Sequence, residues 1–199
     1  MNEKFVVTIT RQFGSLGRPI AKQISENLGI EYYDRDIVDM TAKQMSLPVS
    51  TISDAEEHAK SAFFNMGYPL GMGTTEMQDQ IFLAQSKIIM NLAEKENCLI
   101  VGRCADYILR DKKELLNIFI YAPYAARLRN CVERLNMQPA EAKRMIAQVD
   151  KARESYHKHY SGHSMADKDT KHIMIDSSFL GIEETCDVLT ELIRRRFHL

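Results

Sequence analysis

The chain has 199 residues, 45% of them hydrophobic and 27% charged, and a formal net charge of −1 at pH 7. These values are typical of one globular domain with a proper core, and they provide no strong field to attract a nucleic acid or a membrane surface. Because no N-terminal apolar signal and no long apolar span occur, we expect a cytoplasmic protein whose four cysteines, none in a Cys-x-x-Cys pair, are free thiols.

The chain begins with a β-branched run, 4–10, which is typical of a buried parallel strand. A turn with two glycines follows, and then a helix whose apolar residues recur every four positions, as expected for a helix that packs on a sheet. Gly29 is expected to end this helix. The sequence therefore starts with a strand, a glycine turn and a helix.

Four more apolar runs predict strands, at 30–34, 98–102, 117–122 and 172–176. Between and after them the sequence predicts helices, beginning near Asp36 and Asp54 and then over 81–92, 128–135, 138–160 and 182–193. Five strands alternating with helices indicate an α/β fold with a parallel sheet covered by helices. In such sheets ligands bind beyond the carboxyl ends of the strands.

The first turn is a candidate anion site. Gly14 and Gly17 permit a tight curl, and the helix that follows directs its free N–H groups into the curl. Ser15 could add a hydroxyl donor, and Arg11 or Arg18 positive charge. The pattern G-x-x-x-x-G-K-[ST] of a P-loop is not matched, because Gly17 stands in the lysine position and Arg18 in the Ser/Thr position. A glycine turn without any ligand is the alternative.

Four stretches occur in an informative order: TITRQFGSLGRPIAKQISENLGIEYYDRDIV, CLIVGRCADYIL, VDKARESYHKHY and IMIDSS. Together they resemble the cytidylate kinase-like family, a branch of the nucleoside monophosphate kinases, over nearly the whole chain. The resemblance implies a three-layer P-loop kinase-like fold with a parallel sheet in the order 2-3-1-4-5. It implies a single domain, 1–199, with an acceptor (NMP-type) subdomain at 35–80 and a lid at about 137–165 as inserted parts.

The resemblance also implies ATP and Mg²⁺ as cofactors and a small phosphorylated, CMP-like acceptor. The turn Gly14-Ser15-Leu16-Gly17-Arg18 resembles the ATP-phosphate loop, which in this branch reads Gly-Ser-Gly-Gly-Arg. Arg11, which could supply positive charge beside the turn, is expected to bind ATP with it. The missing lysine is thus a property of the branch, whereas Leu16 in place of glycine is a property of this chain. The ligands of the metal are left open between three residues: Ser15, Asp34 and Asp176.

Acceptor binding is implied for Asp34, Arg35 and Arg103. Asp34 stands where the family begins an Asp-Ser-Gly run, which here continues with Arg35, and Met40 replaces an arginine of the family. Arg103 directly follows an apolar strand, with Cys104 in place of the family's aspartate. A guanidinium at that position can hold a phosphate through two parallel hydrogen bonds.

Asp150 and Arg153 lie three residues apart and share a helix face, as in the Asp-x-x-Arg of the family's lid. With Arg18 they are the expected catalytic residues, since phosphoryl transfer depends on positioning and on cations that neutralise the transition state. A solvated ion pair is the alternative for Asp150 and Arg153.

Three functions stay open on the sequence. The first is an ATP-dependent nucleoside monophosphate kinase. The second is a weak or inactive nucleotide-binding regulatory protein on the same fold, suggested by Leu16 and the missing lysine. The third is a small-molecule kinase with another acceptor, favoured by Arg35 and Met40. The sequence does not give the oligomeric state, and it leaves a homodimer open. It favours a polar lid over a metal site for three histidines: His157, His159 and His163.

Overall fold

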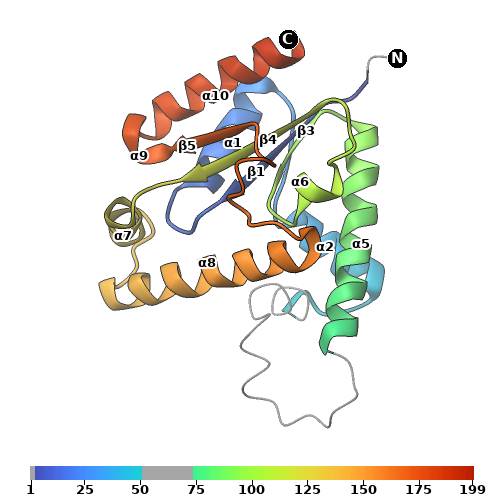
Figure 1. The fold of residues 1–199 in the computed structure, drawn as a ribbon, viewed down its shortest axis with the longest axis horizontal. Helices are drawn as coiled ribbons and strands as arrows, with labels where there is room; N and C mark the ends of the chain where they lie inside the picture. Colours follow the sequence, from blue (N-terminus) through green and yellow to red (C-terminus); the bar gives the residue numbers. More distant parts are fainter. Residues whose placement is uncertain (1–2, 51–73) are drawn as a thin grey trace.

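The computed structural model describes residues 3–50 and 74–199, which form a three-layer α/β structure (Figure 1). Its sheet has five parallel strands in the order β2-β3-β1-β4-β5, which confirms the expected order and the central position of the first strand. The strands are β1 (Val6–Arg11), β2 (Glu31–Tyr33), β3 (Cys98–Val101), β4 (Leu115–Tyr121) and β5 (Ile173–Asp176).

Helices cover both faces of the sheet. They are α1 (Gly17–Leu28), α2 (Asp36–Met45), α5 (Thr74–Lys95), α6 (Ala105–Ile108), α7 (Tyr124–Glu133), α8 (Pro139–Ser161), α9 (Ser177–Leu180) and α10 (Ile182–Phe197). The apolar faces of α1 and α10 pack on one side of the sheet, and those of α2, α5 and α6 pack on the other. In Figure 1 the long helix α8 runs below the sheet, on the side where the loop after β1 lies.

The alternation of buried residues explains why these runs form strands. Val7 and Ile9 of β1 face α1 and α10, whereas Val6 faces the α5 side, so the central strand is buried on both faces. A strand buried on both faces has to be apolar throughout, which is the pattern that the sequence shows. The four cysteines are buried free thiols, as expected.

The inserted parts are described only in part. The expected helix from Asp54, the glycine-rich break at 65–73 and much of the predicted acceptor subdomain lie outside the described residues. The predicted lid, 137–165, is for most of its length the single helix α8, which ends before Gly162 at φ 79°. Its role as a lid stays a prediction. No helix in the described ranges is both long and apolar enough to span a membrane.

Candidate active site

The turn between β1 and α1 is shaped by close approaches of the backbone. Gly14 has φ 78°, and a Cβ on it would come within 2.9 Å of both the Arg127 carbonyl oxygen and Cys131 Sγ. A side chain at this position would therefore have to displace α7. This packing holds the turn against the neighbouring helix.

Leu16 begins α1 in the left-handed conformation, at φ 59°, where the family has a glycine. The first turn of α1 has no side-chain cap and no acidic residue, Pro19 has no N–H, and the Ile20 N–H donates to the Leu16 carbonyl oxygen. The N–H groups without intrahelical partners at the positive end of the helix dipole are therefore those of Gly17 and Arg18. The curl remains a pocket of ≈ 130 Å³, which Leu16 lines together with Gly17, Arg18 and Arg153. Binding pockets for whole ligands are typically about 300–1,000 Å³, so this one suits a phosphate-sized group.

Asp34 follows β2 and is only 3% exposed. Its Oδ2 forms an ion pair with Arg18 Nε, and its Oδ1 lies 3.8 Å from Arg11 Nη2. Among the described residues Oδ1 accepts no hydrogen bond, although it is buried. Asp34 thus pairs with Arg11 and Arg18, which lie on either side of the turn between β1 and α1, and its Oδ1 is left without a hydrogen bond from a described residue.

Arg103 stands in the middle of a strained turn after β3. Gly102, Arg103 and Cys104 have φ values of 76°, 59° and 53°, and a Cβ on Gly102 would collide with Arg11 Nη1. Non-glycine residues in the left-handed region cost on the order of 1–3 kcal/mol each and concentrate at functional sites. Burial and the neighbouring charge of Arg11 lower the pKa of Arg103 to about 10, so it stays cationic at neutral pH.

Arg153 reaches the same place from α8. Its Nη1 donates to the Arg11 carbonyl oxygen at 3.3 Å, and its guanidinium lies 6.0 Å from the centre of the Phe13 ring. Burial and the charge of Arg11 lower its pKa to about 9. The fold therefore gathers the predicted residues Arg11, Arg18, Arg103 and Arg153, where the repulsion between them favours binding of an anion.

Ser15 is not available to a ligand through its side chain, contrary to the expectation of a hydroxyl donor. The residue is completely buried, and Oγ donates to the carbonyl oxygens of Gln12, at 2.9 Å, and Ile120, at 3.2 Å. The Ser15 carbonyl in turn accepts from Ser177 Oγ at 2.7 Å. The hydroxyl therefore joins the turn to β4, and it does not fit as a magnesium ligand.

Asp150 also differs from the expectation. Its Oδ1 accepts from the Phe13 backbone N–H at 2.7 Å, and its Oδ2 forms an ion pair with Arg127 Nη1. Arg127, on α7, is 9% exposed and also donates to the Phe13 carbonyl oxygen at 3.3 Å. The two oxygens of the Asp150 carboxylate thus join α8 to the turn after β1 and to α7. These contacts make Asp150 a structural anchor and leave neither oxygen for a catalytic role.

None of the remaining candidates lines the pocket of the turn between β1 and α1. Arg35 is exposed at the start of α2, where its carbonyl oxygen accepts from Val38, and Met40 is 37% exposed on the same helix. The three histidines have separate partners: His157 meets Asp106 at 2.9 Å, His159 lies 3.8 Å from Asp79, and His163 lies 3.1 Å from Asp167. They do not converge on one point.

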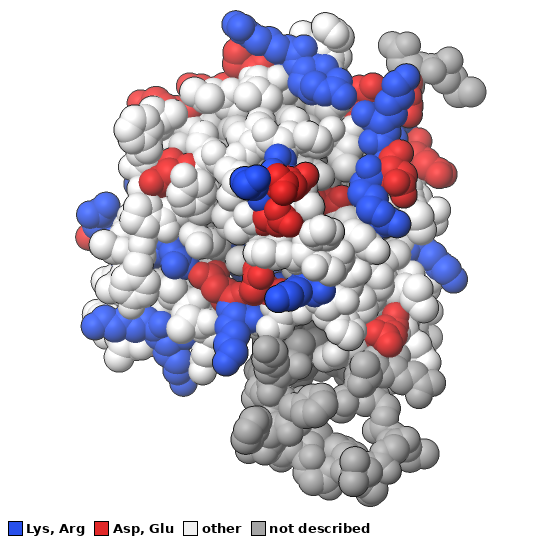
Figure 2. All heavy atoms as spheres, viewed as in Figure 1, with Lys and Arg blue, Asp and Glu red and all other residues white. Residues whose placement is uncertain are grey.

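The sequence interpretation missed the roles of Arg127, Asp106 and Lys171, and it assigned His157 to a polar lid, not to a buried contact with Asp106. Arg127 lies one residue before Leu128 on the apolar stripe of α7, and that position on a buried face was the available signal. For Lys171 the signal was weaker, since only its position directly before a strand distinguished it. On the face seen in Figure 2, basic side chains lie next to acidic ones over much of the surface.

Comparison with known proteins gives a consistent result. A model of the cytidylate kinase-like family matches residues 6–179. The chain is 23% identical to a cytidylate kinase from Aeropyrum pernix, over 92% of this chain and 95% of that one. Its fold is similar to that of an uncharacterised protein from Eubacterium ventriosum, with a TM-score of 0.72 and 24% identity over 96% and 98% of the two chains. It is also similar to a gluconokinase from Sinorhizobium meliloti, with a TM-score of 0.55 and 12% identity over 100% and 98%.

Proposed function

The chain belongs to the cytidylate kinase-like family, and we propose that it catalyses ATP-dependent phosphoryl transfer to a nucleoside monophosphate of the CMP type. The observation that carries the proposal is the convergence of four arginines, from four separate elements, at the carboxyl edge of the sheet. Arg11, Arg18 and Arg153 line the pocket of the phosphate turn, and Gly102, next to Arg103, lies against Arg11.

In this proposal the turn after β1 binds the phosphates of ATP. The free N–H groups of the first turn of α1 and the guanidinium of Arg18 replace the lysine of the common P-loop. Binding requires that Arg18 exchange its partner Asp34 for a phosphate oxygen. Arg153 neutralises charge that develops on the transferred group, since a guanidinium stays protonated throughout the reaction.

Asp34 fits the remaining chemistry. Mg²⁺ usually keeps several waters and binds one or two carboxylates together with phosphate oxygens, and the buried Oδ1 of Asp34 accepts no hydrogen bond within the described residues. Asp34 would therefore hold the metal, which neutralises phosphate charge. Arg103 would hold the phosphate of the acceptor from the opposite side of the crevice.

The second candidate is a nucleotide-binding regulatory protein with weak or no activity. Leu16 favours it, because a left-handed leucine places a bulky side chain at the wall of the pocket where the family has glycine. A kinase with a non-nucleotide acceptor is the third candidate, and the exposed Met40, in place of an expected arginine, favours it.

One screen separates the three candidates. ADP release is measured with ATP and Mg²⁺ against nucleoside monophosphates and against hydroxylated sugars and acids, and nucleotide binding is measured by calorimetry. We expect CMP-type acceptors to give the highest kcat/KM. Turnover of a sugar or acid alone would select the third candidate, and ATP binding without turnover the second. Absence of ATP binding would refute all three.

A matched pair of variants tests the role of Arg153. Arg153→Gln is expected to lower kcat by roughly 10³-fold or more, the scale on which arginines act in phosphoryl transfer. The control is Arg144→Gln, which removes an exposed arginine from the same helix. Equal rates for the two variants would remove Arg153 from the catalytic site.

A further inference from the structure

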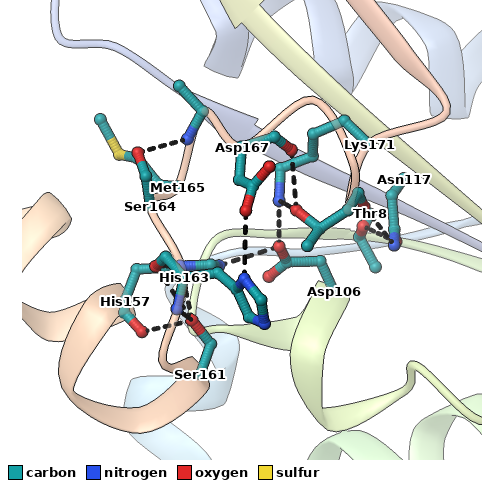
Figure 3. A network of polar contacts seen from close by, with 12 residues as sticks. Thr8, Asp106, Asn117, His157, Ser161, His163, Ser164, Met165, Asp167 and Lys171 are labelled. Atoms are coloured by element: carbon teal, nitrogen blue, oxygen red, sulfur yellow. Dashed lines mark hydrogen bonds and ion pairs between the residues drawn. The ribbon is translucent and has the colours of Figure 1, made fainter.

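A group of three ionisable side chains lies buried behind the arginines, between α6, α8 and the segment before β5 (Figure 3). His157 Nε2 lies 2.9 Å from Asp106 Oδ2, and Lys171 Nζ forms an ion pair with the same oxygen. The exposed fractions of the three side chains are 4% for Asp106, 6% for His157 and 0% for Lys171. We call these residues the buried triad.

His157 and Lys171 make further hydrogen bonds outside the triad. His157 Nδ1 lies 3.0 Å from both Ser161 Oγ and the His163 carbonyl oxygen, and Lys171 Nζ donates to Thr170 Oγ1 at 3.2 Å. Burial alone would raise the pKa of Asp106, but the hydrogen bond and charge of His157, with those of Lys171, lower it to about 2. Buried charges of this kind contribute little net stability compared with apolar packing, so their use suggests a demand for specific geometry.

The triad joins the two elements that carry Arg103 and Arg153. Asp106 comes three residues after Arg103, just beyond the strained turn. His157 comes four residues after Arg153, one turn further along the same face of α8. The 2.9 Å contact between His157 Nε2 and Asp106 Oδ2 therefore brings α8 close to the residues that follow that turn.

Arg153 is anchored on both sides along its helix. Three residues before it, Asp150 accepts from the backbone of the phosphate turn at Phe13. Four residues after it, His157 meets Asp106. The segment that carries Arg153 is thus held between the ATP-phosphate turn and the Arg103 turn.

We propose that the buried triad Asp106–His157–Lys171 is a positioning device, which sets the separation of Arg153 from Arg103. It rests on the proposed function, because the separation matters only if the two arginines act on phosphates. None of its members lines the pocket of the turn between β1 and α1. The members of the triad determine whether one arginine reaches the transferred phosphoryl group while the other holds the acceptor.

Substitutions at His157 test this, because its two ring nitrogens can be imitated separately. His157→Leu removes both polar atoms. His157→Gln keeps an N–H at the place of Nε2, within reach of Asp106. The control is His159→Leu, which alters a side chain two residues away that is 55% exposed.

We expect His157→Leu to lower kcat at least about tenfold while the KM values of ATP and acceptor change less than about threefold, because binding groups remain but their alignment is lost. His157→Gln should recover most of kcat, and His159→Leu should match the wild type. Unchanged kcat in His157→Leu, or an equal loss in His159→Leu, would overturn the proposal. If His157→Leu does not fold, His157→Asn replaces it, since asparagine is too short to reach Asp106.

Hydrogen exchange gives a readout that is independent of turnover. In His157→Leu the amides of 150–157 and of 102–106 should exchange faster together, by about tenfold or more, and in His159→Leu they should not. If the wild type turns over no acceptor, the proposed function fails, but this exchange experiment still tests the link between the two elements. Unchanged exchange in both segments would overturn the proposal.

Discussion

Replacing Asp150 by asparagine separates an anchor from a catalytic residue. The Asp150 side chain is 20% exposed and pairs with Arg127, whose side chain is 11% exposed. Arg127 Nε is already buried and donates no hydrogen bond to any described residue, so the guanidinium depends on the carboxylate. Asparagine keeps the shape and an acceptor for the Phe13 N–H, but it leaves the cation of Arg127 unpaired.

The expected loss of stability in Asp150→Asn follows from the burial of the ion pair between Asp150 and Arg127. Breaking a buried pair by removing one partner costs about 3–5 kcal/mol, and the partial exposure of Asp150 favours the lower end, ~3 kcal/mol. For a chain of this size one kcal/mol shifts Tm by ~2–4 °C, so Asp150→Asn should lower Tm by ~6–12 °C. Thermal unfolding followed by circular dichroism measures the shift.

The control for Asp150→Asn is Asp111→Asn. The Asp111 side chain is 89% exposed and lies 3.8 Å from Arg110, so its loss should stay within about 0.5 kcal/mol. In a double-mutant cycle with Arg127→Met, the two losses should not add, because the second substitution removes the charge that the first leaves unpaired. An unchanged Tm together with a large fall in kcat would refute the anchor and restore Asp150 as catalytic.

Three further predictions concern Arg103, Leu16 in the turn between β1 and α1, and the pH dependence of stability. Arg103→Lys keeps the charge but loses the two-pronged contact, so kcat/KM for the acceptor should fall tenfold or more, from ~1.5–3 kcal/mol, with little change in Tm or ATP binding; unchanged kinetics would remove Arg103 from the site. Leu16→Gly removes a side chain from the pocket wall, so calorimetry should show tighter ADP binding; it also relieves about 1–2 kcal/mol of left-handed strain and costs ~0.4–1 kcal/mol through the greater entropy of the unfolded chain, so Tm should stay within ~6 °C of the wild type; weaker binding would make the leucine part of the site. Burial lowers the pKa of His157, but the hydrogen bond and charge of Asp106 outweigh it and raise the pKa above 6.5. The stability that His157 contributes is therefore complete below pH 6.5 and is lost as the pH rises through the folded pKa, so the Tm difference between wild type and His157→Leu should shrink from about pH 5.5 to about 8.5; a difference that grows with pH would contradict this.

The sequence alone predicted the layers of the fold. Strands buried on both faces are continuous apolar runs, and all five lie within two residues of their expected ends. The order of the strands came from the resemblance to the family, since periodicity does not say which strands are neighbours. Reading the residues after the strands brought out Arg11, Arg18 and Arg103, because parallel strands bring their carboxyl ends to one edge, whereas Arg153 came from the resemblance to the family's lid.

The roles of particular polar groups were decided only by the tertiary structure. Spacing placed Asp150 and Arg153 on one helix face, yet it could not show that Arg127 and the Phe13 N–H occupy both oxygens of the carboxylate. In the same way, Ser15 had the right position for a donor, but its hydroxyl points to the carbonyl of Ile120. A local pattern states which residues lie close along the chain, whereas a hydrogen bond depends on which distant segment packs against them.

The buried triad is the clearest example of contacts that a local sequence pattern does not predict. Asp106 is 51 residues from His157 and 65 residues from Lys171 in sequence, and each lies in a stretch that reads as ordinary helix or loop. Their charges are tolerated in the interior only because folding brings all three together, so that each compensates the desolvation of the others. The sequence determined that a parallel sheet presents arginines at one edge, and only the packing of α8 against α6 decided how far apart two of those arginines stand.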